Sequence, residues 1–260
     1  MAKNYNQLKL DEKALVDKPI TKEEYLAIYK SNILRSKSVG KKVSFFNRIG
    51  HVMITYGHSF LFKLFGVGDL AKTISKKTTN LWTAYRFFHL FLLIIKMKPK
   101  IVVEYGMGIS TIFISEILRY NHRKFGVKGK VISYEQSPEY FKLFSSNVPE
   151  DLKEYISLNL EEVRLDWFEN QRGLYYDTAP EMEDIDIIYI DGPTLAKGCK
   201  KDFSYLGVDI IKLVESQINF KIAVTDKRYV CYNYYKNRLQ PYYNTKLSSL
   251  WRSIVVKPVK

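Results

Sequence analysis

Cysteine and histidine are scarce in this chain, and long apolar runs are missing. Only Cys199 and Cys231 occur among 260 residues, which excludes a disulfide framework and makes a reducing compartment the default expectation. The four histidines show no metal-ligand spacing. Residues 81 to 97 form the most apolar stretch, but Arg86 and Lys96 interrupt it. It therefore falls short of the roughly 20 apolar residues that a membrane span needs.

A secretory leader is also missing, because residues 1 to 13 are polar and of mixed charge. We therefore expect a soluble cytoplasmic protein with no transmembrane span. The oligomeric state has no signal in the sequence.

Positive charge is abundant but unevenly spread. The net charge is +14. Residues 1 to 100 hold 19 Lys and Arg against 6 Asp and Glu, whereas residues 101 to 260 hold 22 against 21. A basic segment beside a neutral one favours an anionic partner, such as a phosphorylated substrate, nucleic acid or a membrane surface. A solvated basic face explains the charge equally well.

This uneven charge suggests that the chain is divided into two structural parts. We expect residues 1 to 79 to be a basic, mostly helical N-terminal extension, because Thr21 and Glu24 form a capping box and apolar residues recur at helical spacing between 52 and 70. That second helix fits packing on the main domain, or a lid, or an amphipathic membrane contact. Residues 80 to 260 form the second part.

The clearest local pattern lies in residues 100 to 118, KIVVEYGMGISTIFISEIL. A β-branched run predicts a buried strand that ends at Glu104. Gly106 and Gly108 then predict a tight turn, with Ser110 and Thr111 where a helix N-cap is expected. Such a unit aims backbone N–H groups and the positive end of a helix dipole at a ligand above the strand.

Further strands and helices alternate along the rest of the chain. We expect strands at residues 131–134, 156–163, 185–190 and 220–225, helices from 137, at 203–215 and at 229–239, and a final antiparallel pair at 243–247 and 251–256. The connection after residue 163 reads as polar and aromatic. This order predicts an α/β, Rossmann-like doubly wound fold with a mainly parallel seven-stranded sheet and an antiparallel last strand.

Acidic residues end four of the five expected parallel strands, at Glu104, Glu135, Asp191 and Asp226. The carboxyl ends of parallel strands meet at one edge, where ligands of such sheets bind. A gathering of four acids at that edge is hard to attribute to solubility. The acid at the end of the first strand, beside the two glycines, indicates a ligand that carries positive charge or amino groups.

These motifs resemble the class I S-adenosylmethionine (SAM)-dependent methyltransferases. The resemblance rests on VVEYGMGIST, on the acid in ISYEQSPEY and on IIYIDGP, and it covers about residues 80 to 260. Within that family, the chain looks most like bacterial O-methyltransferases of small molecules or glycans. The implied cofactor is SAM, and the implied acceptor is a hydroxyl of a small molecule or saccharide.

The resemblance also implies roles for individual residues. Glu104 would support the turn and the methionine end of SAM, and Glu135 would accept hydrogen bonds from the ribose hydroxyls. Asp166 lies roughly where the family contacts adenine. The residues that the resemblance assigns to cofactor binding are Glu104, Tyr105, Gly106, Gly108, Ser110, Thr111, Glu135, Gln136, Asp166 and Asp191.

Asp191 and Asp226 would be the catalytic residues, because both face the expected methyl side and either could remove a proton from the acceptor. Catechol-type relatives bind a metal ion at these two strand ends through one further Asn or Asp. Lys227 stands at that further position, so a divalent metal remains possible but a metal-free site is favoured.

Three alternatives stay open. The basic N-terminal part and the many aromatic residues fit an RNA ribose methyltransferase, although Asp191-Gly192-Pro193-Thr194 lacks the stacking aromatic of base-methylating enzymes. A non-catalytic binding protein held at a membrane or anionic partner is the second alternative. A nicotinamide-dependent oxidoreductase is the third, disfavoured because Thr111 stands where its fingerprint has Gly or Ala.

Overall fold

The structure is a computed structural model that describes residues 81–168, 171–177, 180, 184–193, 206–226, 229–248 and 253–259. The expected N-terminal helices at residues 1 to 79 lie outside the described residues, and so does the start of the helix expected at 203. None of the helices in the described ranges is long and apolar enough to cross a membrane.

A seven-stranded sheet with strand order β3-β2-β1-β6-β8-β10-β9 forms the centre of the fold. Its strands are β1 (Ile101–Tyr105), β2 (Lys130–Glu135), β3 (Ile156–Leu160), β6 (Asp184–Ile190), β8 (Asn219–Asp226), β9 (Tyr243–Ser248) and β10 (Ser253–Pro258). Strands β3, β2, β1, β6 and β8 of this sheet are parallel to one another. Strand β10 is antiparallel to both of its neighbours, β8 and β9. The expected mainly parallel sheet with an antiparallel last strand is therefore confirmed.

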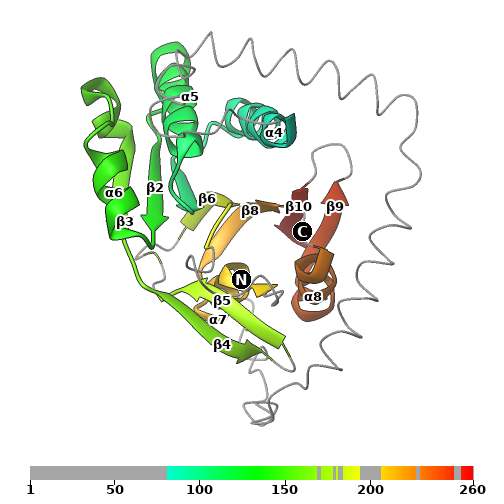
Figure 1. Ribbon diagram of the computed structural model, residues 1–260. Coiled ribbons are helices and arrows are strands. Elements are labelled where there is room, and N and C mark those ends of the chain that lie inside the picture. Colours follow the sequence, from blue (N-terminus) through cyan, green and yellow to red (C-terminus); the bar gives the residue numbers. More distant parts are fainter. Residues whose placement is uncertain are drawn as a thin grey trace.

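Helices cover both faces of this sheet (Figure 1). α4 (Leu81–Met97), α5 (Ile109–Phe125) and α6 (Pro138–Ser145) lie on one face, and α7 (Asp209–Glu215) and α8 (Tyr229–Leu239) on the other. A short 3-10 helix, η3 (Glu150–Tyr155), precedes β3. The doubly wound arrangement is confirmed, because separate buried clusters form on the two faces.

Strand β1 shows why the central strands read as continuous apolar runs. Its side chains alternate between the two faces, so Val102 belongs to the cluster under α5 and Val103 to the cluster under α7. Both valines are fully buried. A strand covered on both faces has no polar side, which explains the β-branched run.

The structure corrects the expectation for residues 156 to 215. A second sheet, β4 (Val163–Phe168), β5 (Gln171–Tyr176) and β7 (Leu206–Gly207), replaces the expected connection. The third strand ends at Leu160 rather than 163, and within the described residues the helix expected from 203 begins only at Asp209. The short strand β7 pairs with Gly173 and Leu174 of β5, so tertiary pairing overrides the local helical pattern there.

Asp186 anchors the amino-terminal edge of the sheet. Its carboxylate accepts the backbone N–H groups of Lys100 (2.6 Å) and Ile101 (3.1 Å) and pairs with the Lys221 ammonium at 2.5 Å. Burial alone would raise the pKa of Asp186, but these donors hold that pKa below its usual value. The ionised carboxylate is thus the form that joins β6 to β1 and β8.

We predict that Asp186→Ala lowers the free energy of unfolding by about 1–3 kcal/mol, because two backbone donors lose a charged acceptor. Since folding depresses this pKa, the contribution is present above the unfolded pKa of about 4 and is lost as the pH falls through the folded pKa. Urea unfolding at neutral and acidic pH measures it. The exposed neighbour Asp184→Ala is the control, and equal effects of the two substitutions would contradict this role.

Candidate functional site

Two glycines set the geometry at the carboxyl ends of β1 and β6. Gly106 has φ of +99°, and a Cβ there would lie 2.6 Å from the backbone nitrogen of Gly192. The Tyr105 carbonyl accepts the N–H groups of Asp191 and Gly192, both at 2.9 Å. The Tyr134 carbonyl at the end of β2 accepts the N–H of Gly106 at 3.0 Å. The ends of β1, β2 and β6 are therefore held in close backbone contact.

Glu104 lies at this junction and is fully buried. Its Oε2 accepts hydrogen bonds from the hydroxyls of Thr111 at 2.5 Å and Ser133 at 2.7 Å. These hydroxyls come from α5 and β2, so one carboxylate oxygen joins three elements. Its other oxygen, Oε1, is buried and has no hydrogen-bond partner. A buried acceptor without a partner costs about 1–3 kcal/mol and is a place where a ligand donor would be stabilising.

Burial also sets the protonation of Glu104. Desolvation raises its pKa to about 7, and the charge of Asp191 adds to this rise. The nearby Ser110 hydroxyl and the Thr111 and Ser133 hydroxyls that donate to Oε2 oppose this rise. Glu104 therefore changes charge near neutral pH unless a cationic or hydrogen-bonding ligand stabilises the carboxylate.

The start of α5 differs from the expectation. Gly108, not Ser110 or Thr111, is the N-cap residue, and the two hydroxyl residues lie buried in the first turn. The Thr111 hydroxyl accepts the Gly108 N–H at 3.0 Å while donating to Glu104, and the Thr111 N–H donates to the Gly108 carbonyl. Thr111 thus holds Glu104 in place. A contact of Ser110 or Thr111 with a ligand stays a prediction.

Glu135 ends β2 and is 8% exposed. Its Oε1 accepts the N–H groups of Gln136 at 2.9 Å and Ser137 at 2.8 Å. Burial raises the pKa of Glu135, and these two N–H donors oppose the rise. Both of these hydrogen bonds end on Oε1, and neither involves Oε2. The carboxylate orientation is therefore fixed by the turn that leads into α6.

Two tyrosines that the sequence motifs did not identify lie near both acids. Burial raises the pKa of Tyr140 to about 12, and the charges of Glu135 and Glu104 raise it as well. Burial also raises the pKa of Tyr176, and the negative charges of Glu135 and Glu104 raise it further. Both phenols stay protonated at neutral pH, so both are hydrogen-bond donors beside the two carboxylates.

Of the two expected catalytic acids, only Asp191 has a described side chain. Asp191 is partly exposed and lies close enough to Glu104 to raise its pKa. The backbone of Asp226 ends β8 and pairs with Ser253 of β10, and its side chain is outside the described part. Glu104, Glu135 and Asp191 thus gather at one edge, whereas the roles of Asp191 and Asp226 stay predictions.

Asp166 lies elsewhere, on β4 of the second sheet. It is exposed, and its carboxylate accepts the Tyr175 hydroxyl at 2.5 Å. The structure therefore places Asp166 in the β4–β5 hairpin rather than in a loop after β3. An adenine contact through this residue stays a prediction that needs the hairpin to border the ligand.

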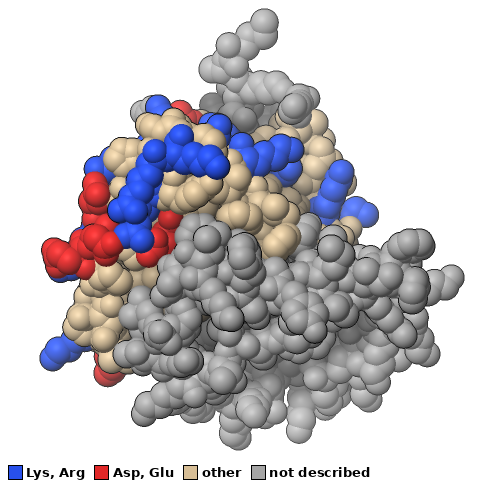
Figure 2. All heavy atoms as spheres, turned by 90° about the horizontal axis from the view of Figure 1, so that it is seen from above, with Lys and Arg blue, Asp and Glu red and all other residues tan. Residues whose placement is uncertain are grey.

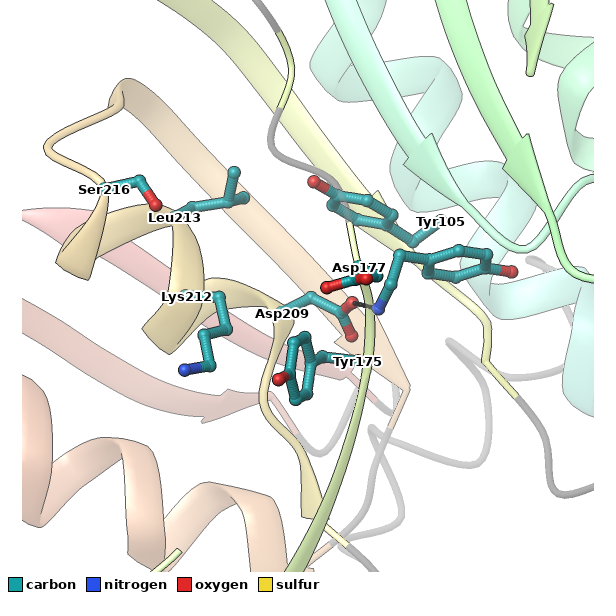
Figure 3. A pocket seen from close by; sticks show the side chains of 8 residues that line it. Tyr105, Tyr175, Asp177, Asp209, Lys212, Leu213 and Ser216 are labelled. Carbon is teal, nitrogen blue, oxygen red and sulfur yellow. Dashed lines mark hydrogen bonds between the residues drawn. The ribbon is translucent and has the colours of Figure 1, made fainter. Parts of the chain in front are cut away.

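Tyr105 also contributes to a cavity of about 240 Å³ between β5 and α7 (Figure 3). Two of the charged groups around it form ion pairs within the protein, Asp177 with Arg164 and Lys212 with Glu215, and Asp209 accepts the Tyr176 N–H through Oδ1. No motif in the sequence signals this cavity, because β5 was not expected. It is lined by Tyr105, Tyr175, Tyr176, Asp177, Asp209, Lys212, Leu213 and Ser216.

Tyr105 points to the face opposite Glu104, where its ring stacks on Tyr134 at 5.3 Å and on Tyr176 at 5.4 Å between centroids. Among the residues with described side chains, no group of three or more His, Cys, Asp or Glu is arranged to hold a metal ion.

Comparison with known proteins gives likeness only at the level of structure. No family model matches the chain, and no curated protein matches it by sequence. A methyltransferase from Geobacter sulfurreducens is 13% identical, with 75% of this chain and 88% of that chain covered and a TM-score of 0.45.

Two further solved structures are similar. A precorrin-6y C5,15-methyltransferase from Geobacter metallireducens GS-15 is 13% identical, with 65% and 86% of the two chains covered and a TM-score of 0.38. A dimethyladenosine transferase from Plasmodium falciparum is 15% identical, with 66% and 61% covered and a TM-score of 0.40. At these TM-scores the likenesses do not assign an activity.

The two glycines of the turn give a matched pair of substitutions. We predict that Gly106→Ala lowers the free energy of unfolding by about 1–3 kcal/mol or more, because φ is positive and the new Cβ meets the Gly192 backbone. Gly108→Ala should change stability by less than about 1 kcal/mol, because Gly108 is extended and its nearest atoms would be 3.8 Å away. Chemical denaturation compares the two, and equal losses would contradict the close contact of β1 and β6.

The raised pKa of Glu104 predicts a specific pH dependence. A carboxyl whose folded pKa exceeds its unfolded pKa binds protons more tightly when folded, so it costs stability as the pH rises from about 4.5 to about 7. Glu104→Gln removes that titration. The stability of Glu104→Gln relative to the unmodified chain should therefore increase across this window and level off above it. Urea unfolding over a pH series measures the difference, and parallel profiles would exclude a titrating Glu104.

Proposed function

We propose that this chain is a SAM-dependent methyltransferase that methylates a hydroxyl of a small molecule or saccharide. The observation that carries the proposal is the buried Oε1 of Glu104, which lacks a partner at the end of β1 and stands near Glu135 of the adjacent strand β2. SAM carries an ammonium group, a sulfonium and two ribose hydroxyls. Acceptor-only carboxylates at neighbouring strand ends suit that set of donors and charges.

Gly108 supports the fit, because the fold itself does not require glycine there. Its φ of −179° is accessible to any residue, and a Cβ would meet only ordinary contacts, with the Tyr140 hydroxyl at 3.8 Å and the Ser110 hydroxyl at 3.9 Å. A glycine in open, extended backbone is explained by a ligand that passes close to the chain. Gly106, in contrast, is explained by the contact between β1 and β6.

The other groups fit named parts of the cofactor. Glu135 is oriented by two N–H donors and would accept the ribose hydroxyls. The protonated phenols of Tyr140 and Tyr176 would donate to oxygen atoms of the ligand. Glu104 would accept from the methionine ammonium, and the bound cation would lower the pKa of Glu104 again.

SAM supplies an electrophilic methyl group on a sulfonium. In the transfer, the bond from methyl to sulfur breaks as the bond from the acceptor oxygen to the methyl forms. The sulfur leaves as a neutral thioether, and the hydroxyl proton passes to a base. The protein has to align the acceptor with the methyl and sulfur, and Asp191 is our candidate for the base.

The test is binding of S-adenosylhomocysteine, measured by calorimetry. We predict that Glu135→Gln weakens affinity about tenfold to a hundredfold, because one charged acceptor for the ribose is lost, whereas the Gln oxygen still accepts the N–H groups of Gln136 and Ser137. Asp191→Asn is the control, and it should retain affinity while losing methyl transfer from labelled SAM to saccharide acceptors.

NAD provides a second comparison, because only the true cofactor should raise the melting temperature by mass action. Stabilisation by NAD and not by S-adenosylhomocysteine would replace the proposal with an oxidoreductase. Equal S-adenosylhomocysteine affinity of the unmodified chain and Glu135→Gln would remove Glu135 from the site. Binding without transfer to any hydroxyl acceptor would favour a non-catalytic binding protein.

A further inference from the structure

Basic side chains gather at the amino-terminal ends of β1 and β2, on the edge opposite Glu104 and Glu135. The backbone brings them together, because the Lys130 N–H donates to the Lys100 carbonyl at 2.8 Å. Lys98, at the end of α4, lies 4.2 Å from the ring centroid of Phe125 at the end of α5. We call this the amino-edge surface and define it by Lys96, Lys98, Lys100, Arg123, Lys124, Phe125 and Lys130, together with Leu92.

The six basic residues of the amino-edge surface are all exposed, and none has an acidic partner among the described residues. The acids nearby are already engaged: Asp186 pairs with Lys221, Glu154 with Lys128, and Asp151 with Arg119. Figure 2 looks onto this end of the molecule and shows Lys and Arg side chains in a band across the described surface. Within the part of the chain that the structure describes, this surface therefore carries positive charge that no acid pairs with.

Apolar side chains accompany this charge. Phe125 is 39% exposed and Leu92 is 41% exposed, both high values for large apolar residues. Leu92 precedes Lys96 by four residues, so the two lie on the same side of α4. Lys98 and Lys124 both stand over the Phe125 ring, at 4.2 and 5.8 Å from its centroid. Apolar and cationic groups thus alternate on one exposed surface.

We propose that the amino-edge surface binds the surface of an anionic lipid bilayer. Lys and Arg near such a surface gain free energy from anionic headgroups, and exposed Leu and Phe beside them bury into the boundary between headgroups and acyl chains. Nucleic acid fits less well, because Lys98 covers a face of Phe125 that a base would need for stacking, and Leu92 would gain nothing from a phosphate backbone.

The orientation that follows keeps the other edge of the sheet accessible. The amino-edge surface lies at the starts of the parallel strands, and Glu104, Glu135 and Asp191 lie at their ends. A bilayer on the first edge therefore leaves the acids facing away from the membrane. This inference goes beyond the proposed function and does not depend on it.

The test is co-sedimentation of the full chain with vesicles of phosphatidylcholine alone or mixed with phosphatidylglycerol. The unmodified chain should bind the mixed vesicles and not the neutral ones. The triple variant Lys98→Glu, Lys124→Glu, Lys130→Glu should weaken binding about tenfold or more. The control triple variant Lys142→Glu, Lys236→Glu, Lys246→Glu changes the charge equally at exposed positions elsewhere and should keep most of the binding.

Leu92→Gln tests the apolar contribution to binding, because it leaves the net charge unchanged. It should weaken binding that persists at high salt, where electrostatic attraction is screened. Unfolding curves of all variants confirm that each is folded.

Four results would overturn the proposal. The unmodified chain could fail to prefer anionic vesicles, or the two triple variants could lose binding equally, which would reflect net charge alone. Unchanged binding by the first triple variant would show that residues outside this surface carry the interaction. If the first triple variant lost binding to single-stranded RNA but kept binding to vesicles, the surface would be assigned to nucleic acid.

Discussion

A single buried carboxylate connects the three elements that form the candidate site. Glu104 receives hydroxyl hydrogen bonds from α5 and from β2 while it belongs to β1. Removing a carboxylate from water is unfavourable, and the hydrogen bonds from Thr111 and Ser133 to Oε2 offset part of this desolvation penalty. Oε1 is desolvated without a hydrogen bond to offset it. The edge of the sheet therefore holds an acceptor that the protein itself does not satisfy.

Most of the fold could be predicted from local sequence because its central strands are buried on both faces. Runs such as Ile101 to Val103 permit little else, and acids that directly follow them had to meet at one edge. The closeness of Glu104, Glu135 and Asp191 follows from parallel order alone. The resemblance to methyltransferases added candidate roles for these residues.

What the sequence did not reveal depends on contacts distant along the chain. The buried tyrosines of β5, Tyr175 and Tyr176, belong to a core cluster whose other members are distant along the chain, and β7 is a strand only because it pairs with Gly173 and Leu174 of β5. Tyr176 reaches the acids from the β4–β5 hairpin, so its position could not be inferred before the hairpin was known. Tyr140 lies only five residues after Glu135, but among 20 tyrosines nothing in its local pattern distinguished it.

The order of strands at the far end of the sheet has a consequence for synthesis. β10 follows β9 in the chain but lies between β8 and β9. While the polypeptide emerges from a ribosome, β8 has an open edge and β9 has no partner in the sheet until residues 253 to 258 appear. Such unpaired edges are sites where other chains add, so the nascent protein is exposed to aggregation at this end of the sheet until β10 is made.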